Sequence, residues 1–171
     1  MYQPFQQQAL VDRSIHVSNA IIIRKDAIDW ENDFPSPGAD IYWDFYISYL
    51  ACRSGKAAYY CKERLTQYRV HNTSMTQSNT RDNFQMKCRW ATSEIFCYER
   101  IIEDTELQEF KPFFNKKLAR AKTALGMSFL RNGQSDLARP YFFQAWGQHK
   151  NLRTVIAIIL SFMPKSLSGH F

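Results

Sequence analysis

Residues 84–102 read FQMKCRWATSEIFCYERII. Apolar side chains recur in this stretch at spacings of four, three, four, three and four residues. They are Phe84, Cys88, Ala91, Ile95, Tyr98 and Ile102. This spacing places them on one face of an α-helix. We therefore expect a long amphipathic helix here, whose apolar face packs against other elements.

Three further helices are expected downstream of this one. The first covers residues 112–131 and ends before Gly133, a residue favoured just past a helix end. The second begins near Ser135, and the last spans residues 152–162. Together with the first stretch they form a predicted helical subdomain, residues 79–171.

Residues 112–150 resemble one tetratricopeptide unit. The resemblance is carried by alternating small and large residues at Leu125, Gly126, Phe129, Gly133, Ala138, Phe142 and Ala145. Lys122 stands where that unit commonly has Trp. A single unit makes no array, because each repeat buries its apolar face on a neighbour. We expect a helical hairpin that packs on the upstream helices.

Residues 38–55 predict one more helix, closed by Gly55. Asp40 is a suitable capping residue, because its side-chain oxygen can accept from free backbone N–H groups. An apolar stripe follows at Phe45, Tyr49 and Cys52. Asp44 lies in the first turn and points from the other face.

Three short segments are typical of β-strands, at residues 14–23, 57–61 and 65–71. In the last of them, alternation places Arg69 and His71 on one face, about 7 Å apart along the strand. The predicted fold class is therefore α+β for residues 1–78, with few strands and one central helix, followed by an all-α subdomain.

The order of these residues resembles the acceptor-side half of the family 2 glycosyltransferases, which have the GT-A fold. Asp44 matches the Asp of a Glu-Asp pair at a helix start, and Gly55 matches the Gly that closes that helix. Tyr68, Arg69 and His71 match a Tyr-Arg-x-His strand end. The similarity covers residues 16–76 and implies the C-terminal half of a GT-A α/β domain.

The resemblance also implies roles for single residues. Asp44 would be the catalytic base that deprotonates the acceptor hydroxyl. Arg69 and His71 would contact the donor diphosphate, His71 would also bind a divalent metal, Mn²⁺ or Mg²⁺, and Trp43 would stack on the acceptor sugar. The donor would be a nucleotide-diphospho sugar, and the acceptor a saccharide or lipid-linked sugar.

Two departures from the family pattern limit that expectation. Trp43 stands where the family has Glu, and the sequence contains no metal-binding Asp-x-Asp. We therefore expect this chain to need a separate nucleotide-binding half for turnover. The alternative is a non-catalytic helical interaction module, in which Asp44 serves the helix dipole, Trp43 packs under its helix, and Arg69 and His71 are solvated.

The amino-acid composition of the chain favours some classes of binding partner over others. The formal net charge is +6, with the densest basic cluster at residues 116–122. The aromatic residues follow helical core stripes and no RNA-binding motif occurs, which disfavours nucleic acid. Residues 155–163 are apolar but shorter than the ~20 residues needed to span a bilayer, so they form a core helix or lie flat on a membrane.

The four cysteines, at positions 52, 61, 88 and 97, form no Cys-x-x-Cys. Without a recognisable signal peptide, reduced and inert thiols in the cytoplasm are the default expectation. By resemblance, the protein would work at the inner face of the cytoplasmic membrane, in peripheral contact with it.

Overall fold

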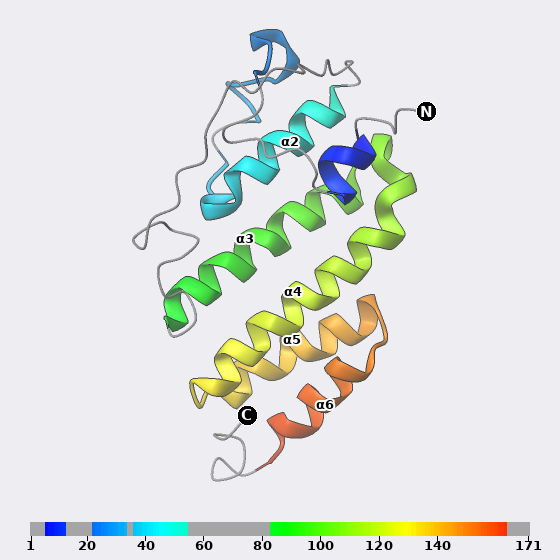
Figure 1. Ribbon diagram of the computed structural model, residues 1–171. Coiled ribbons are helices and arrows are strands. Elements are labelled where there is room, and N and C mark those ends of the chain that lie inside the picture. Colours follow the sequence, from blue (N-terminus) through cyan, green and yellow to red (C-terminus); the bar gives the residue numbers. More distant parts are fainter. Residues whose placement is uncertain (1–5, 13–21, 34–35, 55–82, 164–171) are drawn as a thin grey trace.

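The computed structural model describes residues 6–12, 22–33, 36–54 and 83–163. Five α-helices lie in these ranges: α2 (Trp43–Arg53), α3 (Phe84–Glu103), α4 (Lys111–Arg131), α5 (Ser135–Gln148) and α6 (Leu152–Ser161) (Figure 1). Short turns of helix accompany them: η1 (Gln7–Val11), η2 (Lys25–Ala27), η3 (Asp40–Tyr42) and η4 (Thr105–Phe110). No strand occurs within these described ranges.

The helices follow one another in space in the order in which they follow along the chain. α3 lies between α2 and α4, α5 packs on α4, and α6 packs on both α5 and α4 (Figure 1). The turn η1 returns to the upper end of this stack and contacts α2. The chain therefore forms a helical stack in which α3 and α4 occupy the centre.

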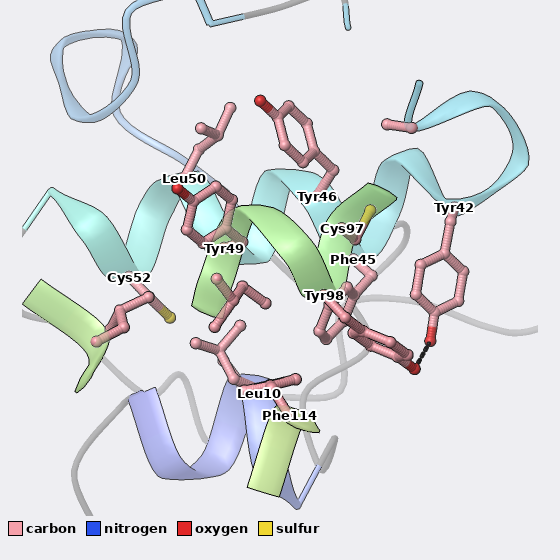
Figure 2. Close-up of a cluster of buried hydrophobic side chains, with 14 of the residues drawn as sticks. Leu10, Tyr42, Phe45, Tyr46, Tyr49, Leu50, Cys52, Cys97, Tyr98 and Phe114 are labelled. Atoms are coloured by element: carbon pink, nitrogen blue, oxygen red, sulfur yellow. Dashed lines mark hydrogen bonds between the residues drawn. The ribbon is translucent and has the colours of Figure 1, made fainter. Parts of the chain in front are cut away.

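The larger core is aromatic and joins α2, α3 and α4. Tyr42, Phe45, Tyr98 and Phe114 are all buried, and the ring centroids of Phe45 and Tyr98 lie 5.9 Å apart in an edge-to-face arrangement. The hydroxyls of Tyr42 and Tyr98 share a buried hydrogen bond of 3.2 Å (Figure 2). Each polar tip thereby finds a partner, which removes the cost of burying an unpaired hydroxyl.

A second, smaller core lies among α4, α5 and α6. It is centred on Phe142, which is fully buried, and includes Leu130, Ala138 and Ala157. Gly133 has φ +75°, a left-handed conformation that Gly adopts at no steric cost. It lets the chain reverse between α4 and α5 while the N–H groups of residues 133 and 134 donate to the last carbonyls of α4.

The helical part of the sequence prediction is confirmed. The stripe in residues 84–102 corresponds to α3, and the three segments after it correspond to α4, α5 and α6 within two residues at each described boundary. Gly126 meets the ring of Phe142, and Ala138 and Ala145 are fully buried. The likeness of this hairpin to a tetratricopeptide unit stays a prediction.

The predicted α+β fold class is wrong: the described residues are all-α. The apolar stripe of α2, which would cover a sheet in a GT-A half, instead packs on α3, α4 and η1. Tyr98 of α3 and Phe114 of α4 supply aromatic partners, and Leu10 of η1 supplies an aliphatic one. Residues 22 and 23, the end of one predicted strand, have no strand structure. The predicted strands 57–61 and 65–71 lie outside the described residues.

The larger core draws side chains from both sides of the predicted domain boundary at residue 78. Leu10 and Phe45 lie before it, and Ile101 and Leu118 lie after it. Residues 6–12 and 40–53 are therefore packed on the helical part through a shared interior, although the proposed division of the chain stays a prediction.

The close contact between α4 and α5 predicts that one added methyl group, at Gly126, destabilises the fold. A Cβ at Gly126 would lie 2.5 Å from the nearest atom of the Phe142 ring, which is fully buried and cannot move outward. Gly126→Ala should lower the free energy of unfolding by about 1–3 kcal/mol through overpacking. Urea unfolding followed by circular dichroism measures the change.

Gly147→Ala is the matched control. It lies in α5 with no atom within 4 Å of its would-be Cβ, so it should raise stability by about 0.5–1 kcal/mol through helix propensity alone. Equal effects of the two substitutions would contradict close packing at Gly126.

Candidate functional site

Asp44, the predicted base, lies in the first turn of α2. Its Oδ1 accepts a hydrogen bond of 2.7 Å from the N–H of Phe45, and its carbonyl accepts one from Ser48. Seven of the eleven residues of α2 are buried, whereas Asp44 is only half-buried. The carboxylate therefore lies at the edge of an otherwise enclosed helix, within reach of solvent.

Trp43 begins α2, and its side chain is 42% exposed. The expected alternative, in which Trp43 packs under its helix, is not what the structure shows. Trp43 precedes Asp44 in the sequence, and its exposed indole is a flat apolar surface suited to stacking.

Two open hollows of the described surface lie beside other polar groups. One, of about 250 Å³, is lined by residues that include Asp40, Cys88 and Arg89. The other, of about 200 Å³, is lined by residues that include Asp33 and Arg53. Neither is lined by Asp44 or Trp43.

Asp40 does not cap α2, which corrects the expectation from sequence. Both of its oxygens accept hydrogen bonds from the guanidinium of Arg89 on α3, at 2.8 and 2.7 Å. Its φ is +33°, a strained value for a residue with a side chain. These bonds from Arg89 hold the pKa of Asp40 below its ordinary value. The Asp40–Arg89 pair thus ties the start of α2 to α3.

Arg69, His71, Tyr68 and Gly55 lie outside the described residues. Whether Arg69 and His71 share a cleft with Asp44 stays a prediction. Within the described ranges, no three His, Cys, Asp or Glu side chains converge into a group that could hold a metal ion. The divalent metal implied by the resemblance therefore has no ligand set in the described part of the chain.

A polar cluster that the sequence did not reveal surrounds Asp104, whose side chain is 6% exposed. It accepts a hydrogen bond of 2.9 Å from the hydroxyl of Tyr49 and lies 3.4 Å from the guanidinium of Arg53. Burial, with the negative charge of Asp104 beside it, raises the pKa of Tyr49. Asp104 also accepts from the N–H of Glu106 at the start of η4, so we assign the cluster a structural role.

The ion pair between Lys122 and Glu99 could not be predicted from the sequence either. Lys122 occupies the position where a tetratricopeptide unit commonly has Trp, and the residue is 7% exposed. Its Nζ lies 3.0 Å from Oε1 of Glu99 on α3. The aliphatic stem fills the space between the helices while the charge reaches a partner.

No family model, curated protein or solved structure matches this chain. None of the described helices is both long and apolar enough to cross a membrane. Function must therefore be argued from the residues themselves.

The cysteine environments predict selective protection from alkylation. Burial raises the pKa of the Cys52 and Cys97 thiols to about 12, so both stay protonated at pH 8, and the thiol is a poor nucleophile. Peptide mapping after iodoacetamide treatment of the native chain should find both unmodified. Cys88 is half-buried and should react faster, whereas urea should expose every cysteine. Rapid native modification of Cys97 would contradict its burial.

The Asp40–Arg89 pair predicts a pH-dependent contribution to stability. Because the folded-state pKa of Asp40 is lowered, the pair stabilises the fold above the ordinary Asp pKa of about 3.9, and that contribution disappears as the pH falls through the folded-state value. Arg89→Gln should unfold at lower urea concentration than the unmodified chain at pH 6, and the difference should shrink by pH 3. An Asp40→Asn background should remove the pH dependence; a difference that is constant with pH would contradict the pairing.

Proposed function

We propose that this chain is the acceptor-side part of an inverting glycosyltransferase that uses a nucleotide-diphospho sugar, with Asp44 as its general base. The observation that carries the proposal is the position of Asp44. It is a half-buried carboxylate in the first turn of α2, at the place in the Gly38–Ser74 stretch where the resembling enzymes have their base.

Sugar transfer needs a proton acceptor beside the attacking hydroxyl, and a positioned carboxylate contributes typically 10²–10⁴-fold to the rate. In the proposed reaction, the carboxylate of Asp44 takes the acceptor hydroxyl proton as the oxygen attacks the anomeric carbon. The bond from that carbon to the diphosphate breaks, and the electron pair leaves with the phosphate oxygen. The exposed indole of Trp43 stacks on the acceptor ring.

The leaving diphosphate needs positive charge, which Arg69 would supply through its planar guanidinium and His71 as a further donor. Both roles rest on the resemblance of Tyr68-Arg69-Val70-His71 to the family's strand end. A divalent metal, if bound by the complete enzyme, would supply further charge stabilisation. The nucleotide itself would be held by the half that carries the Asp-x-Asp motif.

The helical stack has a supporting role in this proposal. The aromatic core fixes α2 against α3 and α4, and the Asp40–Arg89 pair holds the turn that precedes it. A base must be held within a fraction of an ångström of its working position. Packing on two long helices supplies that rigidity.

The test is a single substitution in the chain fused behind a nucleotide-binding half. Asp44→Asn keeps the size of the side chain but removes the proton acceptor, so transfer to an acceptor saccharide should fall by about 10²–10⁴-fold. Asp136→Asn is the matched control, because that carboxylate lies on α5 and is 93% exposed; it should keep full activity. Undiminished transfer by Asp44→Asn would remove Asp44 from the mechanism.

A second candidate function is that of a non-catalytic helical scaffold. It is favoured by the α4–α5 hairpin, where Gly126, Ala138 and Ala145 permit the close packing found in helical repeats. Under this alternative, surface substitutions on residues 112–150 would abolish the binding of a protein partner, and Asp44→Asn would have no effect on it.

A further inference from the structure

The large apolar side chains that are exposed gather on α6. Of the nine such residues in the described ranges, five lie within residues 152–163. We call them the outer face of α6: Leu152, Ile156, Ile159, Phe162 and Met163, which are 40–74% exposed. Four of the five recur at spacings of four, three and four, as one stripe of a helix does.

The fully buried residues of α6 are small or polar. Thr154, Ala157 and Ser161 are buried. The hydroxyl of Thr154 lies 2.9 Å from that of Thr123 on α4, and Ala157 packs in the core around Phe142. Ile158 and Leu160 are partly buried and also pack on that core. The helix therefore attaches through one side, and its remaining bulky apolar residues stay exposed on the other side.

Positive charge lies beside this face. The sequence from residue 137 to residue 171 contains Arg139, Lys150, Arg153 and Lys165 and no Asp or Glu. Lys150 and Arg153 are exposed at the start of α6. At its other end, the guanidinium of Arg139 lies 4.4 Å above the ring of Phe162, but it pairs with Asp136 and donates to the carbonyl of Ser161. An apolar stripe with exposed cationic groups beside it is the pattern of a helix that lies in a membrane interface.

We infer that the outer face of α6 docks on an anionic membrane surface. The apolar side chains enter the boundary between headgroups and acyl chains, and the exposed cations Lys150 and Arg153 bind lipid phosphates. A second copy of the chain is a poorer occupant, because its own outer face brings the same positive charges into contact. The inference is independent of the role proposed for Asp44.

Vesicle sedimentation of the full 171-residue chain tests the inference. The chain should pellet with vesicles of phosphatidylglycerol and phosphatidylcholine, and at least about tenfold less with phosphatidylcholine alone. The double variant Lys150→Gln, Arg153→Gln removes two positive charges and should weaken binding to the anionic vesicles about ten- to thirtyfold. Higher salt should also weaken vesicle binding, because it screens the surface charge.

A matched pair of double variants tests the contribution of the apolar residues to vesicle binding. Ile156→Ser with Ile159→Ser removes two residues of the outer face that are 48% and 53% exposed, and it should weaken vesicle binding at least tenfold. Leu137→Ser with Phe143→Ser removes residues of similar exposure, 54% and 52%, from α5, and it should bind like the unmodified chain. Circular dichroism and thermal unfolding confirm that each variant is folded.

Several outcomes would overturn the inference. They are failure of the unmodified chain to bind anionic vesicles, equal binding to neutral vesicles, and unchanged binding by the Ile156→Ser, Ile159→Ser variant. Analytical ultracentrifugation without lipid supplies one more. Dimers that depend on Ile159, in a chain that does not bind vesicles, would show that a second copy covers the face.

Discussion

The aromatic contact between α2 and the α3–α4 pair is the interaction on which the rest of the structure depends. The rings of Tyr42 and Phe45 meet Tyr98 of α3 and Phe114 of α4 in a buried cluster, and the Tyr42–Tyr98 hydrogen bond pairs the hydroxyls within it (Figure 2). α2 is too short to be stable as an isolated helix. Its structure, and with it the position of Asp44, therefore comes from this packing.

The same stack separates two surfaces with different chemistry. At one end, α2 presents a half-buried carboxylate and an exposed indole, the two groups assigned to acceptor binding and proton transfer. At the other, α6 presents bulky apolar residues beside the exposed cations Lys150 and Arg153. α3 and α4 connect these ends through rigid, continuously packed helices. If both proposals hold, membrane contact occurs at the opposite end of the stack from the carboxylate.

The helices could be predicted from sequence because their signal is local. The stripe from Phe84 to Ile102 and the turn at Gly133 each depend on a few neighbouring residues. The fold class could not, because the stripe of α2 fits a sheet and a helix pair equally well, and the choice depends on Tyr98 and Phe114, more than 50 residues away. Likewise Asp is a residue type that commonly caps helices, but the carboxylate of Asp40 accepts a hydrogen bond from Arg89, which is 49 residues away in the sequence. The apolar run at residues 155–163 favours a core helix over one that lies flat on a membrane, but apolar content alone does not say how much of α6 stays exposed.

Hydrogen–deuterium exchange of the full chain tests the central claim most directly. If α2 is held by the aromatic cluster, the amides of residues 47–53 should exchange as slowly as those in the middle of α3. Both sets should then accelerate together in Tyr98→Ala, because one core protects them. Exchange of the α2 amides within seconds in the unmodified chain, while α3 stays protected, would contradict the account and leave Asp44 without a fixed position.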